Sequence, residues 1–130
     1  MKRILSSLIL ISSFSASAQI VVYTDQGHPP VGVTPAIRVV YLDASERWLQ
    51  QQFGELSSDP EQAVRQAHSL LNSPDWKRRQ KALIEHYRGM IEAWQLGLLK
   101  YPAVVFDNRD VVYGTVDISR AVALRRGENQ

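Results

Sequence analysis

The sequence of 130 residues contains no cysteine. Without thiols the chain has no disulfide, no thiolate nucleophile and no thiolate metal ligand, so disulfide exchange is excluded. Internal repeats, low-complexity tracts and linkers are also absent, and beyond residue 14 no apolar run approaches the length of about 20 residues that a membrane-spanning helix needs. We therefore expect a single domain that is held together by packing alone.

Residues 1–18 have the pattern of a cleavable export signal. One Lys and one Arg precede an apolar stretch over residues 4–14, and small residues at the two positions that signal peptidase reads end at Ala18. The apolar stretch is only about half as long as a spanning helix, which argues against a permanent membrane anchor. We expect cleavage between Ala18 and Gln19, a mature domain of residues 19–130 and a location in the periplasm.

Removing this signal also changes the charge of the protein. The full sequence has 15 basic and 13 acidic residues and a net charge of +2. Two of the basic residues lie in the signal, so residues 19–130 carry 13 charges of each sign. A balanced charge gives no reason to expect nucleic acid or an anionic membrane as the partner.

The sequence predicts two strands, three helices, a hairpin and a closing helix, in this order. Runs rich in Val, Ile and Tyr predict strands at 19–24, 36–42, 101–106 and 111–113. Residues with the character of helix N-caps predict helix starts at Asp43, Asp59, Ser73 and Asp117, with Pro74 and Asp75 directly after Ser73. This order predicts an α/β domain with one mixed four-stranded sheet and helices packed on it.

Details of the helices give further expectations. Asp43 and Glu46 have the spacing of a capping box. Apolar residues form one stripe on the second helix, at positions 63, 64, 67, 70 and 71. The three tryptophans, Trp48, Trp76 and Trp94, fall at inward positions, so we expect them in the core. Any that proves exposed would mark a docking surface.

The C-terminal segments resemble half of a thioredoxin fold. YPAVVFD at 101–107, VVYG at 111–114 and the helix after Asp117 are similar to a strand that opens with a cis-proline, a hairpin and a final helix that covers the sheet. Pro102 takes the place of the cis-proline.

Nearly the whole chain resembles a narrower group, the small exported thioredoxin-like proteins of integrating conjugative elements, relatives of the F-type TrbC-like conjugation proteins. The segments that carry this resemblance are VYT-x-x-x-HP at 22–29, SPDW at 73–76, AW-x-LG at 93–97 and YPAVVFD with VVYGTVD at 101–117. The resemblance implies a role in DNA transfer through an apparatus like type IV secretion, and it supplies no reaction.

The resemblance also implies where this chain departs from redox relatives. They carry Cys-x-x-Cys just after the first strand, where this chain has Asp25-Gln26-Gly27-His28. We therefore expect a non-enzymatic accessory or assembly factor that acts by protein–protein interaction. Its expected partners are envelope proteins of the conjugation apparatus. We expect no cofactor, no metal, no direct binding of nucleic acid and no stable membrane insertion after signal cleavage.

The candidate partner-binding surface consists of Asp25, His28 and Pro29 with Tyr101 and Pro102, because these two segments converge in the thioredoxin fold. The alternative function is a periplasmic hydrolase or metal-dependent enzyme in which Asp25 orients His28 for base catalysis. No nucleophile or further ligand at a recognisable spacing accompanies the pair, and a plain turn also accounts for it. A third possibility is a structural subunit, which would expose an apolar patch of several hundred Å².

The remaining charged and titratable residues favour less specific interpretations. The densest positive cluster consists of Lys77 to Arg79 with Lys81. A functional role for it would be to bind an acidic partner or DNA phosphates. Because its charges do not share one side of a helix, we expect a solvated face instead. His68 and His86 are expected at helix surfaces.

Overall fold

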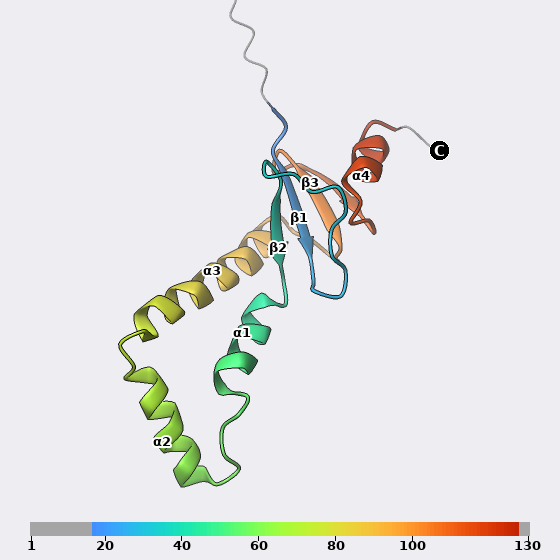
Figure 1. The fold of residues 1–130 in the computed structure, drawn as a ribbon. Coiled ribbons are helices and arrows are strands. Elements are labelled where there is room, and N and C mark those ends of the chain that lie inside the picture. Colours follow the sequence, from blue (N-terminus) through green and yellow to red (C-terminus); the bar gives the residue numbers. More distant parts are fainter. Residues whose placement is uncertain (1–16, 128–130) are drawn as a thin grey trace, which may run out of the picture.

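The computed structural model describes residues 17–127, which fold into a mixed α/β domain with a helical arm (Figure 1). The elements are β1 (Ile20–Thr24), β2 (Arg38–Tyr41), α1 (Ala44–Phe53), α2 (Pro60–Leu71), α3 (Trp76–Gln95), β3 (Ala103–Phe106), β4 (Asp110–Tyr113) and α4 (Ile118–Arg125). The predicted order of strands and helices is therefore confirmed. The predicted export signal lies almost entirely outside the described residues.

The four strands form one sheet in the order β2-β1-β3-β4. β1 runs parallel to β2, whereas β3 is antiparallel to both β1 and β4. The predicted mixed four-stranded sheet is therefore confirmed. The crossover from β1 to β2, residues 25–37, contains no helix, because three prolines interrupt it. It runs beside the start of α4 instead, where the Val31 N–H donates to the Val116 carbonyl at 2.9 Å.

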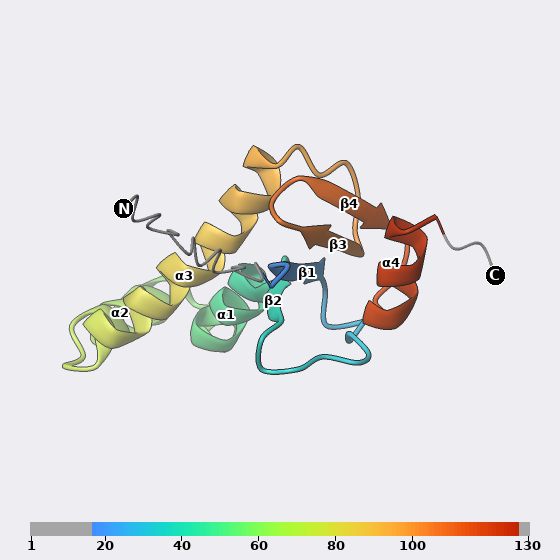
Figure 2. The same cartoon turned by 90° about the horizontal axis from the view of Figure 1, so that it is seen from above.

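Both faces of the sheet are covered, by different helices (Figure 2). Val21, Tyr23 and Val105 pack toward Ala93 of α3, and Val22, Val104 and Phe106 pack toward α4. Successive residues of a strand point to opposite faces, so the neighbours Val21 and Val22 belong to different cores. The two central strands, β1 and β3, are consequently buried on both sides.

The hairpin between β3 and β4 is confirmed. Asp107 and Asn108 both have positive φ, at 54° and 53°. Two consecutive left-handed residues make the tight turn that matches the twist of a hairpin, and Asp and Asn tolerate this backbone conformation better than most residues. Arg125 of α4 pairs with both Asp107 and Asp110, at 3.1 and 2.9 Å, and so ties the closing helix to the turn.

The arm consists of α1, α2 and the first part of α3, and it extends away from the sheet (Figure 1). Its inner contact is aromatic: the Trp76 ring lies 6.0 Å from that of Trp48 and 6.2 Å from that of Phe53. No residue of α2 is buried, so its predicted apolar stripe is left open. Trp94 is 81% exposed, and its predicted place in the core is wrong.

Two of the four predicted helix caps form as expected. The carboxylates of Asp59 and Asp117 accept hydrogen bonds from the backbone N–H groups of Gln62 and Arg120. The predicted capping box at Asp43 is wrong, because that carboxylate accepts from Arg47 and from a neighbouring loop and makes no cap bond.

The predicted start at Ser73 is two residues early, because the Ser73 hydroxyl donates to the Leu70 carbonyl and makes no cap bond. The N-cap position of α3 is taken by Asp75, which also makes no side-chain cap bond. Its carboxylate accepts from Arg78 and Arg79, and these hydrogen bonds, that from Arg78 foremost, lower its pKa. The predicted positive cluster is therefore partly neutralised at the start of α3. His68 is exposed and His86 half-buried, as expected of helix-surface residues. Within residues 17–127 no helix has both the length and the hydropathy to cross a bilayer.

Gly89 sets how closely α3 approaches the sheet. A Cβ atom at this position would lie 2.6 Å from Cγ1 of Val40 on β2, which is far inside contact distance. The next residue on this face of the helix, Ala93, is also small and is buried. Two small residues one turn apart therefore let the backbone of α3 lie directly on β2.

Gly89→Ala tests this close approach. We expect the free energy of unfolding to fall by about 1–2 kcal/mol, because overpacking outweighs the roughly 1 kcal/mol by which Ala favours a helix. Denaturant unfolding measures the change. In a Val40→Ala background, where the clashing methyl is absent, the same substitution should cost much less. An effect of equal size in both backgrounds would contradict the contact.

Candidate functional site

The candidate surface lies at one edge of the sheet. The strands β1 and β2 end there and β3 begins there, because β1 is parallel to β2 and antiparallel to β3. The pairing of Tyr23 with Ala103 brings the loop that follows β1 to the residues that precede β3. We call residues 25–30 together with Tyr101 and Pro102 the sheet-edge surface. The predicted convergence of these two segments follows from this register.

The loop after β1 is a closed turn. The His28 N–H donates to the Asp25 carbonyl at 3.2 Å, and the side chains of the same two residues contact each other at 2.7 Å, Nδ1 to Oδ1. The hydroxyl of Thr24, which is fully buried, donates to the His28 carbonyl at 2.7 Å. The side chain of His28 is 60% exposed and that of Asp25 is 21% exposed. The buried Thr24 hydroxyl thus holds the turn on its inner side, and the imidazole ring of His28 is exposed to solvent.

Asp43 fastens this turn to α1. Its Oδ2 accepts from the Gln26 backbone N–H at 3.3 Å and from Nε of Arg47 at 3.0 Å. Burial by itself raises the pKa of Asp43, but the hydrogen bonds from Gln26 and Arg47 outweigh it and hold the pKa below its ordinary value. Sequence reasoning missed this role. The only local sign of it was an arginine four residues after the aspartate.

The second segment of the surface comes from the start of β3. The bond between Tyr101 and Pro102 is cis, the form that the resemblance implied for Pro102. The Pro102 carbonyl accepts from the Gly114 N–H at 2.9 Å, and the side chain of Tyr101 is 52% exposed. Tyr101 borders an open hollow of about 460 Å³, whose other lining residues are Leu42, Met90, Ala93, Trp94, Leu98, Leu99 and Lys100.

The exposed apolar residues beside this hollow were not foreseen as a group. Trp94 is 81% exposed and Leu99 is 89% exposed. Helical periodicity placed Trp94 inward because it continues the apolar rhythm of α3. The one local signal was Leu99, an apolar residue that lies between the helix and the predicted strand at 101–106.

The Asp25–His28 pair has the contact that base catalysis requires, but few groups accompany it. Both residues belong to one short turn, and their side chains meet at a largely open surface. Among residues 17–127, no group of three or more His, Cys, Asp or Glu side chains is placed to hold a metal ion. The pair therefore offers hydrogen-bonding groups at the surface.

The predicted cleavage site lies elsewhere. Gln19 directly precedes β1, and its backbone N–H donates to Oδ1 of Asp107 at 2.9 Å. Because Asp107 is in the hairpin turn, this contact lies at the sheet edge opposite the sheet-edge surface. The predicted cut between Ala18 and Gln19 would therefore leave the sheet-edge surface untouched.

Fold and surface together define a cysteine-free α/β domain with a mixed four-stranded sheet and an open, aromatic sheet edge. A family model described as a protein of unknown function, DUF1525, matches residues 17–127. The chain therefore belongs to the DUF1525 family. No curated protein and no solved structure matches it.

Asp43→Asn tests how the turn is fastened, because it removes the charge and keeps the shape. Since folding lowers the pKa of Asp43 from an unfolded value of about 3.9, the carboxylate stabilises the folded state at neutral pH. This contribution disappears as the pH falls through the lower folded-state pKa. We expect the variant to be less stable than the wild type at about pH 7 and equally stable at about pH 2.

Denaturant unfolding at both pH values measures this difference. Glu46→Gln is the matched control, because Glu46 is close to Asp43 in the sequence. Among the described residues, its carboxylate has no hydrogen-bond or ion-pair partner. A stability loss in Asp43→Asn that does not change with pH would refute the electrostatic role.

Proposed function

We propose that this protein is a non-enzymatic accessory or assembly factor of an integrating conjugative element. It works in the periplasm by binding envelope proteins of the DNA-transfer apparatus. The observation that carries the proposal is the sheet-edge surface, on which exposed His28 and Tyr101 come from two segments far apart in the sequence. The biological setting rests on the resemblance of the chain's sequence segments to proteins of conjugative elements.

We also propose that the domain is thioredoxin-like. A strand that opens at the cis bond before Pro102, a hairpin and a closing helix occur in the implied order. The turn at Asp25 to His28 takes the place of the Cys-x-x-Cys segment of redox relatives. The helix-free crossover at residues 25–37 is a departure from that pattern, and it leaves the turn tied to Thr24 and Asp43.

The chemistry of the surface favours an extended or loop segment of a partner protein. Tyr101 and Leu99 offer apolar contact area, and aromatic side chains are frequent anchors of protein interfaces. His28 and Asp25 supply hydrogen-bonding groups at the rim, and Lys100 lines the hollow beside Tyr101. A partner with an apolar side chain flanked by polar groups fits this arrangement.

Crosslinking in cells tests the proposed surface. A photoreactive amino acid at position 28 or 101 should capture envelope proteins of the transfer apparatus, identified by mass spectrometry. Position 119 is the control, because Ser119 is exposed on α4 and lies outside the sheet-edge surface. The same captured proteins at all three positions would exclude a specific interface at the sheet edge.

A transfer assay tests the function itself. Deleting the gene should lower the frequency of DNA transfer between cells. The double variant His28→Ala with Tyr101→Ala should lower it at least about tenfold, since loss of two interface residues worth about 1 kcal/mol each weakens binding to this degree. Ser119→Ala should transfer normally at an equal protein level. Undiminished transfer by the deletion strain would remove the assignment to conjugation.

A further inference from the structure

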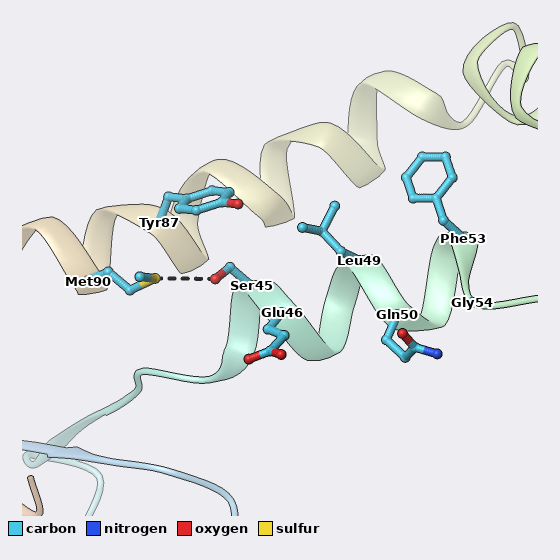
Figure 3. A pocket seen from close by; sticks show the side chains of 8 residues that line it. All are labelled: Ser45, Glu46, Leu49, Gln50, Phe53, Gly54, Tyr87 and Met90. Carbon is cyan, nitrogen blue, oxygen red and sulfur yellow. Dashed lines mark hydrogen bonds between the residues drawn. The ribbon is translucent and has the colours of Figure 1, made fainter.

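The arm carries an apolar groove between α1 and α3 that no part of the described chain fills. Leu49 and Phe53 point from α1 toward α3, and Tyr87 and Met90 lie across from them (Figure 3). The groove has a volume of about 450 Å³. The Ser45 hydroxyl donates to the sulfur of Met90 at 3.2 Å and closes one end. The lining is apolar at the base, with Glu46 and Gln50 at its margin.

The apolar surface continues from this groove along α3. Met90 lines both the groove and the hollow beside Tyr101, and Trp94 follows it one turn later on the same side of the helix. Tyr87 is 41% exposed and Trp94 is 81% exposed. The neighbouring side of α3, at Gly89 and Ala93, is the side that packs on the sheet. We call Leu49, Phe53, Tyr87, Met90 and Trp94 the arm groove.

A further apolar face within the described residues is the stripe on α2. Val64 is 56% exposed and Leu71 is 45% exposed, and no residue of the helix is buried. From Ala63 to Leu71 the stripe is about 12 Å long at 1.5 Å per residue. The stretch of α1 that borders the arm groove, Ser45 to Gly54, is about 14 Å long by the same measure. A helix such as α2 therefore fits the groove in length and in polarity.

We propose that the α2 stripe of one copy of this protein occupies the arm groove of a second copy, and the reverse, in a twofold homodimer. Each chain has one stripe and one groove, so a twofold dimer makes two stripe–groove contacts. These contacts cover both faces of both chains. This dimer goes beyond the partner-binding function proposed above. The arm groove shares Met90 and Trp94 with the hollow beside Tyr101, whereas His28 and Tyr101 lie outside it.

Area and charge both support a second copy as the occupant. With the sizes of aromatic and aliphatic side chains, the exposed parts of the groove and the stripe offer roughly 500 Å² per copy, hence about 1,000 Å² in the dimer. This reaches the lower bound for a specific interface. The stripe carries no charged residue, and residues 19–130 carry 13 charges of each sign, so two copies meet without net repulsion.

Disulfide crosslinking tests the dimer. The native sequence has no cysteine, so each introduced cysteine is the only thiol in its chain. Val64→Cys chains, distinguished by a tag, are mixed with Tyr87→Cys chains and oxidised. We expect a mixed disulfide dimer, which cannot arise within one chain because each chain has a single thiol. Arg65→Cys is the matched control, since Arg65 is on the polar side of α2 with an exposed side chain. Failure of Val64→Cys to exceed this control overturns the proposal.

Sedimentation of purified protein gives a second, independent measurement. Wild-type protein should sediment as a dimer, and Val64→Glu and Trp94→Glu should each be monomeric while circular dichroism stays unchanged. Mixing the two variants should restore part of the dimer, because one of the two contacts then has a wild-type stripe and a wild-type groove. A wild-type monomer at about 100 μM overturns the proposal, and so does a dimer that neither substitution weakens.

Discussion

β1 and β3 lie side by side at the centre of the sheet, and their antiparallel pairing supports every other part of the domain. Alternate residues of the two strands enter opposite cores, with Val21 and Val105 facing α3 and Val22 and Val104 facing α4. The same register brings the turn after β1 next to Tyr101 and Pro102. A shift of one residue would exchange the two cores and separate the two halves of the sheet-edge surface.

The two sides of the sheet tolerate change differently. On the α4 side, Ile118 and Ala121 complete a small core, and Arg125 fixes the helix to the hairpin turn. On the α3 side, the approach at Gly89 leaves no room for a side chain beyond a hydrogen atom. The first half of α3 extends past the sheet and carries the arm (Figure 1).

The sequence predicted the elements that local chemistry decides. The strands are rich in β-branched residues, the caps at Asp59 and Asp117 have a backbone donor three residues on, and the hairpin turn needs residues that accept positive φ. Each of these features depends on residues within about four positions, so it can be predicted from the local sequence alone. The order of strands and helices then restricted the sheet to a mixed one.

The predictions that were wrong depend on distant partners. Asp43 has the sequence of a capping box, but the backbone N–H of Gln26 comes within reach only after β1 and β2 have paired. Trp94 has inward helical spacing, but the sheet beneath α3 is only wide enough to cover the side that carries Gly89 and Ala93. Periodicity reports which side of a helix is apolar, and it does not report whether enough structure exists to cover all of that side.

The turn from Asp25 to His28 is held by hydrogen bonds. Redox proteins of the kind that the chain resembles carry Cys-x-x-Cys just after the first strand. Here the Thr24 hydroxyl and the Asp43 carboxylate hold the turn from two different elements. A turn that is already fixed loses little conformational freedom when a partner binds, so more of the contact energy remains for affinity. For the partner-binding function that we propose, these two hydrogen bonds therefore hold the turn in place without thiols.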